Sequence, residues 1–234
     1  MFGMIGLIPA AGKGTRLGDL GKRIHKSLVK INNITLLERA INNLKKANVS
    51  KIIVIVGYKK EQIILFLNSK DFGVRIETIF QEEQRGLAHA ILQAEAVINE
   101  PFIIQLPDNI IEADFSNLIN EFFKNNADFI QFYKEVNNQQ DSLPTLLIKN
   151  NLIIEITKYY KGNKGYKGVP IYIIKPIFFN YCNKLMKNLK PSEELRETDV
   201  MLEMIKDKRK VMAIKFDGKL THITTNQDLK REQI

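Results

Sequence analysis

Residues 4–17 read Met-Ile-Gly-Leu-Ile-Pro-Ala-Ala-Gly-Lys-Gly-Thr-Arg-Leu, an apolar segment that runs directly into a loop of small residues. The apolar part predicts a buried strand. The two glycines of the loop allow a sharp turn and let backbone N–H groups approach anionic oxygens. Thr15 adds a hydroxyl, Arg16 a planar guanidinium and, after a spacer, Lys26 an ammonium group. The stretch therefore predicts a strand followed by a cradle for a triphosphate.

Two better-known glycine loops do not fit this segment. A P-loop needs four residues between its glycines and a lysine directly after the second, and neither condition is met. A dinucleotide-binding loop has the pattern Gly-x-Gly-x-x-Gly, whereas the third glycine here, Gly18, comes one position late. These mismatches favour a phosphate-binding loop of another kind.

Apolar runs alternate with amphipathic segments along the chain. In the first half, strands are predicted at 51–57, 75–80 and 101–106, and helices at 34–46 (capped by Thr35), 61–67 and 87–98. In the second half, a helix is predicted at 115–125 and strands at 129–133, 146–148 and 152–156, the last two joined by a turn at Asn150-Asn151. We therefore expect a single α/β domain over 1–234, with a Rossmann-like, doubly wound, mostly parallel mixed sheet flanked by helices.

The composition excludes several classes of protein. The net charge of +9 predicts an anionic partner, but the basic residues are scattered and form no nucleic-acid motif, so no nucleic acid is expected. The single cysteine, Cys182, excludes an intramolecular disulfide and a cysteine-based zinc site. No apolar run approaches the roughly 18 residues of a membrane span, and no signal peptide is evident. We expect a soluble, cytoplasmic protein without membrane association.

The segment Ala-Ala-Gly-x-Gly-Thr-Arg, with a lysine ten residues further on, resembles the signature of the sugar nucleotidyltransferases, which join an NTP to a sugar 1-phosphate. The resemblance is strongest over 4–110 and looser over 150–230. It implies the nucleotide-diphospho-sugar transferase type of fold, with an NTP-binding half at 1–110 and an acceptor-binding half at 111–234. It also implies nucleotide contacts, including a glutamine and a glycine at the nucleobase: Ala10, Ala11, Gly12, Lys13, Gly14, Thr15, Gln81 and Gly86.

Asp108 closely follows the strand predicted at 101–106 and should lie beside the glycine loop, because ligands bind at the carboxyl edge of such sheets. Mg²⁺ binds through one or two carboxylates plus phosphate oxygens and water. The resemblance implies the same role, although Pro107 stands where the family has Gly or Ala. We predict Arg16, Lys26 and Asp108 as catalytic residues and Asp108 as the ligand of Mg²⁺, or of Mn²⁺.

The acceptor half departs from the family pattern. The resemblance implies Asn109, Gly168 and Glu197 as acceptor contacts, while Thr198 is an alternative cap for the following helix. The family's Glu-Lys-Pro is missing, which leaves Lys158 or Lys161 to supply positive charge. His222 stands where the family has a second metal-binding carboxylate. It is a doubtful ligand because imidazole suits softer metals than Mg²⁺, and Asp217 is an alternative.

These residues predict a nucleotidyltransferase that condenses an NTP with a phosphorylated small molecule, most simply a sugar 1-phosphate. A phosphate monoester is largely dianionic at pH 7 and can attack the α-phosphorus without a general base. The site must then align two anions and neutralise the charge on the leaving pyrophosphate. This is the task that the predicted cations and metal would perform.

Two alternatives remain open. The Ile-Pro-Ala-Ala-Gly opening also resembles cytidylyltransferases for alcohol phosphates such as phosphocholine, whose quaternary ammonium Tyr159, Tyr160 and Tyr166 would surround. A degenerate nucleotide-binding relative that regulates a partner is favoured by His222 and opposed by the retained Arg16, Lys26 and Asp108. The nucleobase, the acceptor and the formation of a homo-oligomer are also left open.

Overall fold

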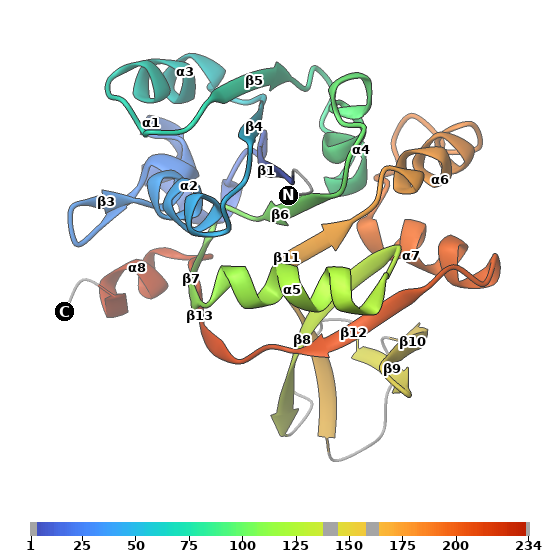
Figure 1. The fold of residues 1–234 in the computed structure, drawn as a ribbon. Coiled ribbons are helices and arrows are strands. Elements are labelled where there is room, and N and C mark those ends of the chain that lie inside the picture. The colour runs from blue at the N-terminus through green and yellow to red at the C-terminus, as the bar shows by residue number, and fades with distance from the viewer. Residues whose placement is uncertain (1–3, 138–144, 158–163, 233–234) are drawn as a thin grey trace.

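The structure, a computed structural model, describes residues 4–137, 145–157 and 164–232. A nine-stranded sheet runs through it in the order β5-β4-β1-β6-β11-β8-β12-β10-β9 (Figure 1). The first four strands in this order are β5 (Ile76–Phe80), β4 (Lys51–Val56), β1 (Ile5–Ala10) and β6 (Phe102–Gln105). The three pairs that these four strands form with one another are all parallel. Burial of β1 and β4 between helices explains why their sequences are continuously apolar.

The other strands of the sheet are β11 (Lys164–Ile174), β8 (Phe129–Asn137), β12 (Val211–Lys215), β10 (Leu152–Thr157) and β9 (Thr145–Lys149). Here β8 and β12 are parallel, and the other neighbouring pairs are antiparallel. The predicted mixed α/β sheet is confirmed, but it is not mostly parallel as predicted, because parallel pairing is concentrated in the N-terminal half. Asn150 and Asn151 form the predicted turn between β9 and β10, with φ of 52° and 61°.

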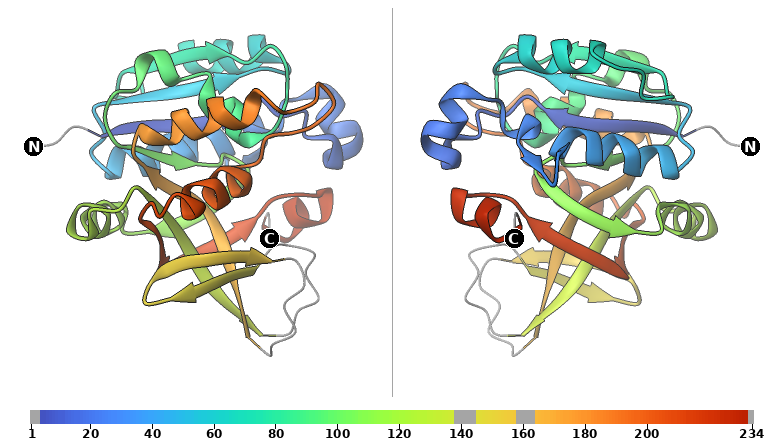
Figure 2. Two further views of the ribbon diagram at one scale, coloured as in Figure 1. Left: turned by 90° about the vertical axis from the view of Figure 1, so that its right-hand side faces the viewer. Right: turned by 90° about the vertical axis from the view of Figure 1, so that its left-hand side faces the viewer.

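Helices cover both faces of the sheet. The main ones are α2 (Leu36–Lys46), α3 (Lys60–Asn68), α4 (Leu87–Leu92), α5 (Phe115–Asn125), α6 (Ile177–Met186) and α7 (Glu197–Lys206). Apolar residues of α2, α3 and α5 join one core cluster and those of α4, α6 and α7 the other. Figure 2 shows α6 and α7 on one side of the molecule and α2 on the opposite side. Thr35 caps α2 as predicted, accepting the Glu38 N–H at 3.1 Å.

Short elements complete the fold. They are η1 (Thr15–Leu17), α1 (Gly18–Arg23), η2 (Lys26–Leu28), β2 (Lys30–Ile31), β3 (Ile34–Thr35), η3 (Glu95–Val97), β7 (Asn109–Ala113), β13 (Gly218–His222) and α8 (Asn226–Glu232). The helix predicted at 87–98 is therefore wrong in length, since α4 ends at Leu92 and a 3₁₀ turn follows. β7 and β13 form an antiparallel ribbon outside the main sheet. No helix in the described part of the chain is both long and apolar enough to cross a membrane.

Candidate active site

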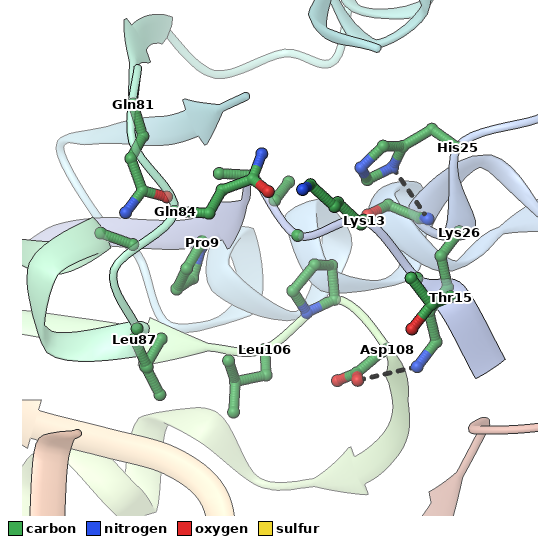
Figure 3. Close-up of a pocket in the computed structure, with 18 of the residues that line it drawn as sticks. Pro9, Lys13, Thr15, His25, Lys26, Gln81, Gln84, Leu87, Leu106 and Asp108 are labelled. Carbon is green, nitrogen blue, oxygen red and sulfur yellow. Dashed lines mark hydrogen bonds and ion pairs between the residues drawn. The ribbon is translucent and has the colours of Figure 1, made fainter. Parts of the chain in front are cut away.

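A cavity of about 520 Å³ lies beside the loop after β1 and the carboxyl ends of β1 and β6 (Figure 3). The predicted residues that line it are Ala10, Ala11, Gly12, Lys13, Gly14, Thr15, Lys26, Gln81, Gly86 and Asp108. Lining residues that the sequence analysis did not assign to the site are Pro9, His25, Ser27, Gln84, Leu87, Ala90, Leu106, Pro107 and Glu194. Segments that follow several strands and the loop before α7 thus meet at one cavity.

Gly14 allows the loop to adopt its conformation. Its φ of 60° lies in the left-handed region, which side chains other than glycine seldom adopt. A Cβ at this position would also approach the Cβ of Lys26 to 2.9 Å. The missing side chain therefore lets Lys26 pass close to the loop and enter the cavity.

Lys26 and Asp108 meet inside the cavity. Lys26 Nζ lies 2.9 Å from Asp108 Oδ2, and the Lys26 side chain is only 13% exposed, against 43% for Asp108. Asn109 is buried and its side-chain amide donates to Asp108 Oδ1. The ion pair joins the segment after α1 to the end of β6, and Asn109 contacts the carboxylate instead of the cavity.

Arg16 lies outside this cavity. It is exposed and lines an adjoining cavity of about 210 Å³ with Gly14, Thr15, Lys26 and Thr224. The structure gives its side chain no hydrogen bond or ion pair with any described residue. Because Gly14, Thr15 and Lys26 border both cavities, the two spaces meet at the glycine loop.

Gln81 and Leu87 lie at the other end of the main cavity, away from Lys26 and Asp108 (Figure 3), and Gly86, which precedes Leu87, also lines the cavity. Gln81 is 2% exposed, and its Nε2 lies 2.9 Å from His89 Nδ1. Burial lowers the pKa of His89, which keeps this imidazole neutral at pH 7. The contact with His89 thus fixes the side-chain amide of Gln81, while Gln81 still lines the cavity.

The backbone at Gly86 is joined to the segment that leads into α7. Leu195 N–H donates to the Arg85 carbonyl at 2.8 Å, and Ala88 N–H donates to the Leu195 carbonyl at 3.1 Å. Gly86 has a φ of 96°, and a Cβ there would lie 2.4 Å from the Leu195 oxygen. Only glycine allows this close approach without a shift of one segment.

We expect Gly86→Ala to lower the free energy of unfolding by about 2 kcal/mol, because the new methyl group forces a strained backbone and a displaced neighbour. Gly12→Ala is the matched control, since a Cβ there would meet no atom within 4 Å. Chemical denaturation measures the free energy of unfolding of both variants. Equal stability of the two would show that the contact with Leu195 imposes no constraint.

The predicted acceptor residues lie outside the cavity lining or outside the described residues. Glu197 begins α7, and its Oε1 lies 3.5 Å from the Tyr172 hydroxyl. Burial raises the pKa of both groups. Gly168 lies on β11, where a Cβ would approach Gln131 Cδ to 3.0 Å, so its lack of a side chain serves packing. Lys158 and Lys161 lie outside the described residues.

Two predictions for this region are wrong. Thr198 does not cap α7, because the helix begins one residue earlier and Asp199 accepts the N–H of Arg196 at 3.0 Å. Asp217 cannot take the place of a second carboxylate beside Asp108. It precedes Gly218, which pairs with Ala113 at the far end of the β7–β13 ribbon, about 13 Å along the strand from Asn109.

His222 lies at the end of β13, next to the segment that holds Asp108. It pairs with Asn109 across the β7–β13 ribbon, and the next residue, Ile223, donates its N–H to the Asp108 carbonyl at 3.1 Å. The His222 side chain is exposed and does not line the main cavity. Among the described residues, no three His, Cys, Asp or Glu side chains gather closely enough to hold a metal ion by themselves. Among the described residues, Asp108 and Glu194 are the carboxylates that line this cavity, and Asp108 is the one paired with Lys26.

Comparisons with known proteins agree with this geometry. Residues 5–142 match the Nucleotidyl transferase family. The chain is 31% identical to the UTP–glucose-1-phosphate uridylyltransferase AglF of Haloferax volcanii, over 92% of this chain and 89% of AglF. It is 32% identical to the bifunctional protein GlmU of Methanococcus aeolicus, over 97% of this chain but only 53% of GlmU.

Solved structures share the fold over the whole length. A putative glucose-1-phosphate thymidylyltransferase from Bacillus anthracis superposes with a TM-score of 0.85 at 26% identity, covering 98% of this chain and 94% of the other. A UDP-glucose pyrophosphorylase in complex with UDP-glucose has a TM-score of 0.82 at 21% identity, covering 99% and 97%, and shows the fold alone. The chain belongs to the nucleotidyl transferase family and is a nucleotidyltransferase.

Proposed function

We propose that the protein condenses an NTP with a sugar 1-phosphate and releases an NDP-sugar and pyrophosphate. The observation that carries the proposal is the Lys26–Asp108 pair beside the glycine loop, a cation and a carboxylate held 2.9 Å apart in one cavity. The names of AglF and of the Bacillus anthracis protein, which specify glucose 1-phosphate, support this choice of acceptor.

The residues of the chain suit an in-line attack on the α-phosphorus. The acceptor phosphate is already dianionic near pH 7, so the reaction needs no general base. Backbone N–H groups of the glycine loop, together with Lys13 and Lys26, would bind the nucleotide phosphates in the main cavity. Arg16 would bind the leaving pyrophosphate from the adjoining cavity. Together these cations reduce the repulsion between two anionic substrates.

Asp108 fits the chemistry of Mg²⁺. Its side chain is 43% exposed in the cavity, and one carboxylate is enough for Mg²⁺ when phosphate oxygens and water complete the shell. We therefore infer that Asp108 would hold Mg²⁺, or Mn²⁺ in its place, which when bound would neutralise charge on the phosphates. We assign no metal to His222, because imidazole is a poor match for this hard cation.

The two ends of the cavity suggest where each substrate lies. We infer that the nucleobase lies between Gln81 and Gly86, at the end away from Asp108. Glu197, which lies outside the cavity lining and 3.5 Å from the Tyr172 hydroxyl, stays a predicted acceptor contact that would accept hydrogen bonds from sugar hydroxyls. Asn109, Gly168 and Lys158 stay predictions from the resemblance. On this view 1–110 is the NTP-binding half and 111–234 the acceptor-binding half of one domain.

The test is release of pyrophosphate from each of ATP, CTP, GTP, UTP and dTTP, with Mg²⁺ or Mn²⁺, against a panel of sugar 1-phosphates and phosphocholine. We expect release that requires one NTP together with a sugar 1-phosphate. Release from CTP and phosphocholine would replace this proposal with the alcohol-phosphate alternative. Nucleotide binding by calorimetry without release from any pair would favour a regulatory role.

A further inference from the structure

His25 lies directly before Lys26 and is held on two sides. Its Nδ1 accepts the backbone N–H of Ser27 at 3.1 Å, and its own backbone N–H donates to Gln62 Oε1 at 2.7 Å. The residue is 2% exposed, yet it lines the main cavity. These contacts fix both the backbone and the ring of His25 at the point where the chain enters the site.

The contact with Ser27 also determines which ring nitrogen carries the proton. A nitrogen that accepts a hydrogen bond has no proton, so the neutral ring of His25 carries its proton on Nε2. Burial, the largest effect, lowers the pKa of His25 to about 4, and the ring is neutral at pH 7. The ring therefore presents an Nε2–H donor in the direction away from Ser27.

Within the part of the chain that the structure describes, that donor has no hydrogen-bond partner. Nε2 is buried and makes no hydrogen bond to any described residue. The ring lies on the side of the cavity occupied by the glycine loop (Figure 3), and the backbone of Gly12 is close enough to raise its pKa against the effect of burial. Gly12 itself is exposed, with no atom within 4 Å of the place where a Cβ would stand. The Gly12 backbone thus lies near a buried donor that has no partner among the described residues, and the space beside the Gly12 Cα is open.

We infer that His25 is a positioning residue for the glycine loop: on binding of the triphosphate, its Nε2–H donates to the Gly12 carbonyl and fixes the Gly12–Lys13 peptide. In a planar trans peptide, the Gly12 carbonyl and the Lys13 N–H point in opposite directions. A ring that holds the carbonyl from the buried side therefore directs the Lys13 N–H into the cavity. This inference rests on the proposed function, because it places the nucleotide phosphates at this loop.

Two substitutions separate the two nitrogens of the ring. His25→Asn puts an amide oxygen near the place of Nδ1, where it can accept from Ser27, but supplies no donor at Nε2. His25→Gln reaches the place of Nε2 with an amide donor and gives up the Nδ1 position. We expect His25→Asn to weaken NTP binding about tenfold and to raise KM for the NTP, with KM for the acceptor unchanged. His25→Gln should bind the NTP within about threefold of the wild type.

The readouts are calorimetric Kd values for the NTP that the wild type binds most tightly among the five, KM for each substrate, and thermal unfolding. In ¹⁵N-histidine-labelled wild type, NTP addition should sharpen a protonated Nε2 signal of His25 while Nδ1 stays unprotonated. Unchanged NTP affinity in His25→Asn would overturn the inference, as would equal losses of affinity and stability in both variants. Failure of the wild type to bind any NTP would instead contradict the proposed function itself.

Discussion

Asp108→Asn is expected to lower kcat about 10⁴-fold and to leave the fold intact. The substitution keeps the shape of the side chain but removes the carboxylate that lies beside the glycine loop and pairs with Lys26. A bound metal contributes several kcal/mol of charge stabilisation in the transition state, and about 1.4 kcal/mol corresponds to tenfold in rate. Steady-state pyrophosphate release measures the loss, and circular dichroism checks the fold.

Glu112→Gln is the control for Asp108→Asn. Glu112 lies on β7, a few residues further along the chain, and among the described residues its side chain forms only an exposed ion pair with Lys219 at 3.7 Å. Such pairs contribute about 0–1 kcal/mol to stability, so neither activity nor fold should change. Turnover of Asp108→Asn at the wild-type rate would remove Asp108 from the catalytic site.

Arg16→Ala should lower kcat about 10³-fold, the lower end of the range seen when arginines of other phosphoryl-transfer enzymes are absent. The guanidinium is exposed and borders the adjoining cavity next to Lys26 and Thr224. It makes no hydrogen bond or ion pair with any described residue, so its removal should not lower the stability of the fold. Arg16→Lys should recover part of the rate, because it restores the charge but not the planar fork that binds two phosphate oxygens.

Arg23→Ala is the matched control for Arg16→Ala, since Arg23 is also exposed, lies nearby at the end of α1 and lines neither cavity. Its turnover should equal that of the wild type. A loss of less than about tenfold in Arg16→Ala would show that the leaving pyrophosphate does not extend into the adjoining cavity.

Local sequence patterns predicted the parts of the site that lie at the end of a strand. The loop with Gly12 and Gly14 and the carboxylate of Asp108 each follow an apolar run, and parallel strands bring their carboxyl ends to one edge of the sheet. Lys26 was predicted as a site residue only from the motif, and its ion pair with Asp108 was not predicted. The structure adds the reason, since Gly14 leaves room for the lysine to pass.

Features that depend on pairing between distant segments were not predictable in this way. The contact between Tyr172 and Glu197 brings the start of α7 next to β11, and no spacing in the chain encodes it. Asp217 was a wrong candidate because the register of the β7–β13 ribbon places it at the far end. The Nε2 donor of His25, which has no partner among the described residues, could likewise not be predicted, because it follows from burial and from one backbone contact of the ring.

The most direct test follows the oxygen atoms of the acceptor. The enzyme is incubated with its preferred NTP and a sugar 1-phosphate whose non-bridging phosphate oxygens are oxygen-18, and the products are analysed by mass spectrometry. Attack of the acceptor phosphate on the α-phosphorus predicts that all the label enters the NDP-sugar and that the pyrophosphate is unlabelled. Label in pyrophosphate or in free phosphate, or no NDP-sugar from any NTP and sugar 1-phosphate tested, would contradict the proposed reaction.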